Sequence, residues 1–164
     1  MKKESESWRS ARRVLLGAAI LAVSASPAAF AGECPADKTG ADLTKPGPAQ
    51  SSGVTDTVLS AIDLAKTPVA LDGYKLRIRR LVVQPGGIVA WHSHADRPSN
   101  IYIIEGSITE YRSTCSAPIE HVAGDTVAEV GANLQHWWRN NTDKPAVLTS
   151  SDLFHDKMSD KHVM

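Results

Sequence analysis

Two histidines at alternate positions in a short β-like segment are the residues best suited to chemistry. His92 and His94 form an H-x-H pair, and His136 follows well downstream after further β-like runs. Because side chains alternate across a strand, His92 and His94 should project from the same face. Imidazoles that converge on one point at distances near 2 Å can hold a single metal ion. The pattern therefore predicts a metal site, provided that the third ring joins the first two.

The other histidines have weaker contexts. His121 sits on a short predicted strand just before a turn, and we expect it at the surface. His155 and His162 fall in a polar C-terminal stretch and should be solvated. An exposed H-x-H pair binds no ion tightly, so a barrel that keeps its fold without any metal remains the alternative.

Short strands must position these rings. No long segment after the N-terminal leader has apolar residues at helical spacing, whereas β-branched and alternating runs recur between turn residues. Pro85-Gly86-Gly87 predicts a turn between two of them. The first candidate, 54–64, could be a strand or a short helical turn. The other strands are expected at 76–83, 88–94, 100–104, 107–112, 119–122, 126–130, 134–139 and 146–150. Such a series is typical of an all-β sandwich or barrel.

The spacing of glycines and histidines resembles the two motifs of the cupin superfamily. The first block comprises Gly86, His92, His94 and Gly106, and the second comprises Gly124, Asp125, His136 and Asn140. The resemblance covers roughly residues 76–148. It implies a cupin-type jelly-roll β-barrel that holds a metal on His92, His94 and His136, and it suggests a homodimer.

The sequence departs from the family pattern at the fourth ligand. Ser99 stands where these motifs have a glutamate, and the turn before His136 is one residue longer. Asp96 or Glu129 could supply a substitute carboxylate, although the spacing of both fits poorly. Three neutral imidazoles leave the full charge on the ion and suit a divalent transition metal: Fe, Ni, Zn, Cu or Mn.

Aromatic and basic residues near the motifs are candidates for substrate binding. Trp137 and Trp138 must face opposite sides of a strand, so one of them could line the pocket, although core filling explains both equally well. Tyr102, Trp138 and Arg139 are the substrate-binding residues we predict. Arg139 and Arg97 could receive an anion, but we expect Arg97 to be a surface charge.

The resemblance implies a small-molecule ligand and leaves three functions open. The first is a metal-dependent oxygenase, such as a dioxygenase, or an isomerase acting on a small oxygen-bearing molecule. No residue stands out as a general base, and Tyr102 and Glu110 are the candidates. The second is a non-catalytic module that binds a metal and a small molecule. The third is a metal-free structural barrel.

The N-terminus indicates export. A basic leader, a short apolar run and Ala29-Phe30-Ala31 predict a signal peptide over 1–31, cleaved after Ala31, and a retained membrane anchor is the alternative. The Arg12-Arg13 pair only loosely matches a twin-arginine signal. The mature protein should be periplasmic or secreted, with an irregular arm over 32–53, a barrel over 54–150 and a polar tail over 151–164.

Charge and cysteines narrow the partners. The leader carries five Lys or Arg and two Glu, so its removal takes the formally neutral chain to about −3. A mildly acidic protein argues against nucleic-acid binding, and no second apolar run could span a membrane after cleavage. In an oxidising compartment Cys34 and Cys115 should form a disulfide; two free thiols are the alternative.

Overall fold

The computed structural model of the chain describes residues 32–155 and 157. The predicted signal peptide and residues 156 and 158–164 of the predicted tail lie outside the described residues. Within the described part, no helix is long and apolar enough to cross a membrane. The described elements, in chain order, are η1 (Ala36–Lys38), β1 (Ser52–Asp63), η2 (Leu64–Lys66), β2 (Tyr74–Ser93), β3 (Ser99–Glu105), β4 (Ser107–Arg112), β5 (Ile119–Val122), β6 (Thr126–Glu129), β7 (Gln135–Arg139) and β8 (Ala146–His155).

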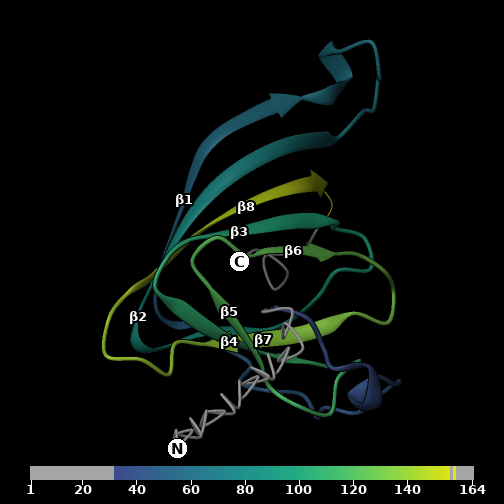
Figure 1. The fold of residues 1–164 in the computed structure, drawn as a ribbon. Coiled ribbons are helices and arrows are strands. Elements are labelled where there is room, and N and C mark those ends of the chain that lie inside the picture. The colour runs from purple at the N-terminus through teal and green to yellow at the C-terminus, as the bar shows by residue number, and fades with distance from the viewer. Residues whose placement is uncertain (1–31, 156, 158–164) are drawn as a thin grey trace, which may run out of the picture.

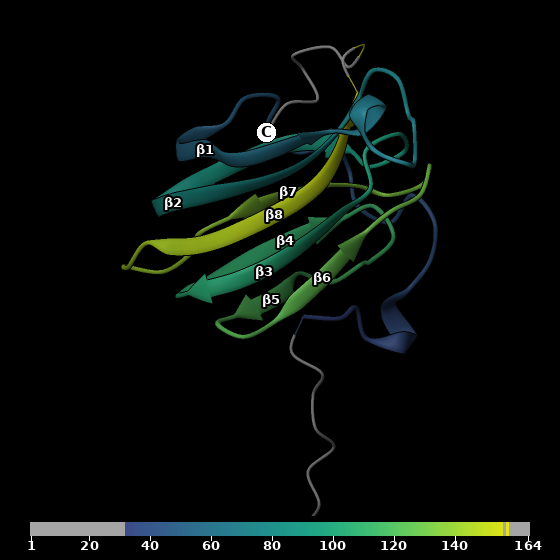
Figure 2. The same ribbon diagram turned by 90° about the horizontal axis from the view of Figure 1, so that it is seen from above.

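These strands form a single antiparallel sheet that curls into a barrel. The order across the sheet is β5-β4-β7-β2-β8-β3-β6, and β1 pairs with β2 off this path. Figure 1 shows β8, β3 and β6 in one layer opposite β4, β5 and β7, and Figure 2 shows the same two layers from above. Layers of this kind bury one face of each strand and leave the other solvated. The predicted all-β, cupin-type jelly roll is therefore confirmed.

The long strand β2 connects the two layers. The sequence predicted two strands separated by a turn at 85–87, and this prediction is wrong because the chain does not reverse there. Residues 74–83 pair with β8, whereas residues 88–93 pair with β7. Gly86 has a φ of +73°, and its amide donates to the carbonyl of Asn140 at 2.9 Å. The glycines thus redirect the strand rather than end it, and carry its second half into the other layer.

Alternation along the strands builds the core between the layers. On β3, Ser99, Ile101 and Ile103 are buried, whereas Asn100 and Tyr102 are exposed. The same period of two applies on β2 and β8. The resulting buried cluster consists of Leu81, Val83, Val89, Ile101, Ile103, Ile108, Val127, Trp138, Ala146 and Leu148.

The segment before β1 packs against the barrel at several points. The predicted disulfide between Cys34 and Cys115 is present, with a Cα–Cα distance of 5.8 Å. Thr44 donates from its hydroxyl to the carbonyl of Cys115 at 2.7 Å, and the amide of Trp91 donates to the carbonyl of Pro48 at 2.8 Å. Hydrogen bonds therefore hold this arm against the barrel in addition to the disulfide.

The last strand continues beyond its predicted end. The sequence placed a strand over 146–150, but β8 runs to His155 because it pairs on both sides. His155 lies opposite Tyr74 on β2, and Asp152 lies opposite Ser99 on β3. This extension brings the buried Asp152 into the barrel, where it contacts arginines of β2.

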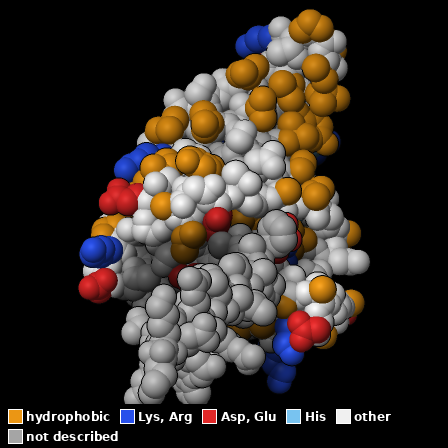
Figure 3. All heavy atoms as spheres, viewed as in Figure 1, with side chains coloured by type: hydrophobic (Ala, Val, Ile, Leu, Met, Phe, Trp, Pro, Cys, Tyr) orange, Lys and Arg blue, Asp and Glu red, His pale blue; other side chains and the backbone are white. Residues whose placement is uncertain are grey.

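Hydrophobic side chains gather on the surface around the β1–β2 hairpin (Figure 3). The exposed apolar residues on these two strands and the loop between them are Val58, Leu59, Ile62, Val69, Leu71, Leu76 and Ile78. Exposed apolar surface on this scale is typical of an interaction site.

Candidate metal centre

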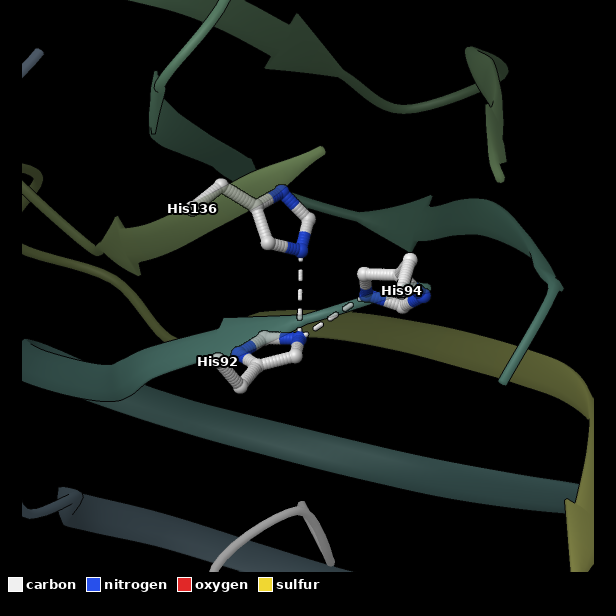
Figure 4. Close-up of side chains that lie close together, drawn as sticks. All are labelled: His92, His94 and His136. Carbon is white, nitrogen blue, oxygen red and sulfur yellow. Dashed lines mark hydrogen bonds between the residues drawn. The ribbon is translucent and has the colours of Figure 1, made fainter. Parts of the chain in front are cut away.

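Strand pairing brings the three predicted metal ligands together. His92 and His94 occupy alternate positions on β2, and His136 on β7 lies opposite His92 in the register. All three side chains are buried. Figure 4 shows the three rings pointing toward one another. The Nε2 atom of His92 lies 3.0 Å from that of His94 and 3.1 Å from that of His136.

The opposite ring nitrogens determine which tautomer each histidine adopts. The Nδ1 atoms of His92 and His94 lie 2.8 and 2.9 Å from the backbone carbonyls of Ala90 and Arg97. A carbonyl oxygen can only accept, so each Nδ1 carries the proton and donates it. Each Nε2 therefore presents a lone pair to the centre. Fixing the tautomer through Nδ1 in this way is the usual arrangement of metal-binding histidines.

His136 is oriented by a carboxylate instead of a carbonyl. Its Nδ1 forms a short hydrogen bond with Oε1 of Glu110. Nε1 of Trp138 also approaches this Nδ1, at 3.1 Å, but the ionised carboxylate is the stronger partner for its proton. Glu110 additionally accepts from Nε2 of His121 at 3.0 Å and from Nε of Arg112 at 2.8 Å.

The geometry fits a single cation shared by the three rings. Three lone pairs that face one another repel unless a proton or a cation lies between them, and the Nδ1 bonds leave no Nε2 proton. Two nitrogens about 2.1 Å from one ion are themselves roughly 3.0–3.4 Å apart, depending on the angle at the metal. The observed Nε2 separations lie in this range, so the donor set and its spacing fit a divalent transition metal.

The side chain of Glu129 reaches the same centre from β6. Its Oε2 lies 3.2 Å from Nε2 of His94, and its Oε1 lies 3.4 Å from Nε2 of His136. The hydroxyl of Ser99 donates to Oε2 of Glu129 at 2.6 Å, across a direct β3–β6 register pair. Asp96, the other substitute carboxylate considered from the sequence, is exposed. A carboxylate therefore stands at the centre, on the strand next to the one that the family motif predicts.

Burial and neighbouring charges favour the protonation states that bind metal at the histidines. Burial, followed by the electrostatic effect of the neighbouring His136, lowers the pKa of His94 to about 3. The same two causes hold the pKa of His92 well below its ordinary value. Burial raises the pKa of Glu129. Burial would also raise the pKa of Glu110, but His136, His121 and Arg112 outweigh it and hold this pKa well below the ordinary value.

A small cavity of about 350 Å³, part of it open to solvent, lies beside the histidines. Its polar wall contains His92, His94, Glu129, Arg79 and Arg97. Its apolar wall consists of Leu81, Val89, Ile101, Leu148 and Trp138.

Of the three predicted substrate-binding residues, one lines the cavity and two are exposed. Trp138 lines the cavity, and Trp137 faces the other way and stacks on Tyr111. Tyr102 is 47% exposed and Arg139 is exposed, because strand alternation turns both side chains away from the barrel interior.

Two expectations about charged side chains are wrong. Arg97 is 1% exposed and lines the cavity rather than the surface, and burial, followed by the charge of Arg79, lowers its pKa to about 10. His121 is fully buried, stacked on Trp138 and bonded to Glu110. Its alternation with Ile119 on β5, both facing inward, was the available signal for this placement.

Comparison with known families matches residues 79–152 to Cupin_2, a cupin domain. No curated protein sequence matches the chain. One similar solved structure is the Cupin_2 domain of an XRE family transcriptional regulator from Enterobacter cloacae, at 14% identity and a TM-score of 0.47, covering 62% of this chain and 96% of that one. A second is a Cupin 2 conserved barrel domain protein from Salinispora arenicola, at 18% identity and a TM-score of 0.45, covering 60% and 74%. A third is an oxalate oxidase in complex with glycolate, at 20% identity and a TM-score of 0.46, covering 69% and 57%.

Residues 79–152, which run from β2 to β8 and carry both histidine blocks on adjacent strands of the jelly roll, therefore form a cupin domain.

Proposed function

We propose that this protein binds one divalent transition-metal ion through His92, His94, His136 and Glu129, and uses it to bind and transform a small oxygen-bearing molecule. The observation that carries the proposal is the convergence of three Nε2 lone pairs. The Nε2 atoms of His94 and His136 lie 3.0 and 3.1 Å from Nε2 of His92. Repulsion between these lone pairs makes a cation the partner that completes the arrangement.

Each group of the chain has a distinct role in this proposal. A bound ion supplies Lewis acidity and open positions for an oxygen donor. Glu110 holds the ring of His136 in position through Nδ1, and Ser99 holds the carboxylate of Glu129. The aliphatic wall and Trp138 exclude water from the side of the cavity away from the ion, which strengthens polar interactions inside it.

An oxygenase or isomerase is the reaction class that we propose. A metal ion held there would have room for an oxygen donor in the small, partly apolar cavity, and this suits either class because both reactions bring an oxygen donor to a Lewis acid. The alternative is binding without turnover. Binding without turnover is favoured because the described cavity offers no side chain suited to act as a general base. The titratable side chains that line it are His92, His94, Glu129, Arg79 and Arg97. With three of these assigned to the ion, neither arginine is suited to act as a general base.

Metal content and turnover separate the alternatives. Elemental analysis of purified mature protein should find one transition-metal ion per chain, lost in His136→Ala, and absence of metal from both would favour a structural barrel. Oxygen-consumption and product assays after loading with Fe, Ni, Mn, Cu or Zn then test catalysis. Tight metal binding without turnover across a broad set of small oxygenated substrates would favour the binding module.

We also propose that the protein is exported and cleaved after Ala31. The disulfide between Cys34 and Cys115 supports this proposal, because such bonds persist in oxidising compartments. N-terminal sequencing of the protein from a periplasmic or secreted fraction should begin at Gly32, whereas recovery of the whole chain from the cytoplasm would contradict export.

The homodimer suggested by the family resemblance is proposed at the exposed apolar surface of the β1–β2 hairpin. Light scattering after gel filtration should give twice the mass of the mature chain, and Ile62→Lys should halve it. A monomeric wild-type protein would contradict this assignment.

A further inference from the structure

The ring of His121 is fully buried, yet only one of its two nitrogens has a partner. Its Nε2 lies 3.0 Å from Oε2 of Glu110, and a carboxylate oxygen can only accept, so Nε2 carries the proton. In the neutral ring, Nδ1 then holds a lone pair. This atom is buried and has no hydrogen-bond partner among the residues that the structure describes. A buried acceptor destabilises a protein unless a donor reaches it.

Gly32 is the residue that lies against this nitrogen. A side-chain carbon added to Gly32 would be 2.9 Å from Nδ1 of His121 and 3.4 Å from Oδ2 of Asp125. A carbon that close to the ring would clash with it, and Gly32 also has a φ of +92°, which other residues rarely adopt. The position therefore favours glycine, and the space beside its Cα faces both an acceptor and a carboxylate.

The proposed cleavage after Ala31 would make Gly32 the first residue of the mature protein. A peptide nitrogen is held by the residue before it, but a free amino group can turn about the Cα–C bond between staggered positions about 120° apart. One such turn moves the nitrogen of Gly32 to the place of the added carbon, because N–Cα and C–C bonds differ by less than about 0.1 Å. There it would lie close to 2.9 Å from Nδ1 of His121, which is a normal hydrogen-bond length.

The disulfide keeps Gly32 near this place. Cys34, two residues further along, is bonded to Cys115. Because consecutive Cα atoms are about 3.8 Å apart, the Cα atom of Gly32 stays within about 7.6 Å of that of Cys34. An amino group confined in this way has a high effective concentration beside His121, which favours binding there.

We propose that His121 and Asp125 form a binding site for the α-amino group that cleavage after Ala31 releases. This inference rests on the proposed cleavage and does not depend on the metal. The amino group donates a hydrogen to Nδ1 of His121. When protonated, it is also attracted by the carboxylate of Asp125, whose Oδ2 accepts from the amide of Val122 at 2.8 Å.

An amino group at this site completes a chain of hydrogen bonds that ends at the metal centre. His121 donates to Glu110, and Glu110 holds Nδ1 of His136. The face of the His121 ring stacks on Trp138, with ring centroids 4.7 Å apart. The freed amino group is therefore a positioning group, because it fixes the ring of His121 from the side opposite Glu110.

The test compares two proteins that differ at their first residue. One is the mature protein with Gly32 first, released from a fusion by a protease that leaves no extra residue. The other begins with Ala31, so it keeps a free amino group but displaces it by one residue. Acetylation by an N-hydroxysuccinimide ester, followed by mass spectrometry, measures how fast each amino terminus reacts. Each rate is divided by that of the same protein unfolded in urea, and circular dichroism verifies folding.

Two variants of the mature protein and one spectroscopic measurement complete the design. Asp125→Asn removes the proposed carboxylate partner, and Glu33→Gln is the matched control because Glu33 is an exposed acid next to Gly32. Nitrogen NMR of the histidine rings reports whether Nδ1 of His121 accepts a hydrogen bond. A change in overall stability alone would not move that signal.

We expect the amino group of Gly32 to react about 10-fold more slowly than that of the protein that begins with Ala31, the factor that one charge-assisted hydrogen bond contributes. The Nδ1 signal of His121 should be that of a hydrogen-bonded acceptor only in the protein that begins with Gly32. Asp125→Asn should recover part of the reaction rate, and Glu33→Gln should not change it. Equal normalised rates in the two folded proteins, or the same Nδ1 signal in both, would overturn the inference.

Failure of the proposed cleavage gives a different result. If the protein from a periplasmic or secreted fraction does not begin at Gly32, but the amino group of the prepared mature protein is protected, the cleavage proposal fails while the site stands. If the exported protein begins at Gly32 and its amino group reacts as fast as that of the longer protein, the cleavage proposal stands and the site fails. Both decisions use unsubstituted proteins, so they hold even if Asp125→Asn does not fold.

Discussion

Exchanging Ser99 and Glu129 tests whether the carboxylate ligand has moved to the neighbouring strand. The two residues face each other directly on β3 and β6, and the hydroxyl of Ser99 lies 2.6 Å from Oε2 of Glu129. Glu129→Gln keeps the size of the side chain and its capacity to bond to Ser99, but removes the charge. The double variant Ser99→Glu, Glu129→Ser returns a carboxylate to the position that the family motif predicts.

The expected magnitude follows from sharing the binding energy among four ligands. Protein sites of four ligands bind Zn²⁺ with about 10–16 kcal/mol, so one ligand contributes roughly 2–4 kcal/mol if the shares are equal. Its loss should weaken metal binding by about 30-fold to 1,000-fold. Glu129→Gln should show this loss. The double variant should recover most of it, because the new carboxylate starts from the paired position.

Competition with a chelator, followed by Co²⁺ absorption, measures these affinities. Asp96→Asn is the matched control, since Asp96 is an exposed acid on the loop that follows His94. It should bind metal as tightly as the wild-type protein. Unchanged metal affinity in Glu129→Gln would refute the assignment of Glu129 as a ligand. A loss of metal affinity in Asp96→Asn would indicate that Asp96 supplies the carboxylate instead.

Further expected outcomes follow from the same structure. Glu110→Gln should weaken metal binding about 10-fold to 100-fold, as loss of an outer hydrogen-bond partner does; the same chelator competition measures it, and an unchanged affinity would mean that Glu110 does not orient His136. Cys34→Ser should cost about 4 kcal/mol of unfolding free energy, since the disulfide closes a loop of 81 residues; urea denaturation with and without reductant checks this, and equal midpoints would contradict it. In the metal-free protein, His94 has a folded-state pKa of about 3 against an ordinary 6.5, so the unfolded chain binds more protons and stability should fall as the pH drops from about 6.5 toward 3; a urea midpoint that is the same at pH 7 and pH 5 would count against this contribution. Burial raises the pKa of Glu129, which must lose its proton to bind metal, so metal affinity should rise with pH more steeply in the wild-type protein than in Glu129→Gln; parallel pH profiles would contradict that difference.

Local rules predicted the strands and the shared face of His92 and His94, whereas the cupin-type barrel and the third histidine were predicted from the motif resemblance. The period of two places His92 and His94 on one face, and it also places Trp137 and Trp138 on opposite faces. Motif spacing in the two blocks then identified His136 as their partner. The faces of the strands depend on neighbouring positions that the sequence displays directly, and the pairing of His136 with the first two histidines depends on the family motifs.

Features that depend on register between distant strands, and that the family motifs do not specify, could not be predicted. Glu129 reaches the centre because β6 pairs with β3 at Ser99, and no spacing in the sequence specifies that pairing. Arg97 appeared to be a loop charge, but it is buried because β8 extends far enough to place Asp152 beside it. Likewise, the glycines at 86 and 87 are typical of a reversal, and only pairing with β7 shows that they bend a continuous strand.

X-ray absorption spectroscopy of the metal-loaded mature protein tests the central claim most directly, because the outer-shell scattering of imidazole rings counts the histidines on the ion. The account predicts three imidazole nitrogens at about 2.0–2.1 Å, with the remaining positions taken by oxygen. Fewer than three imidazoles in a stoichiometrically loaded protein would contradict it.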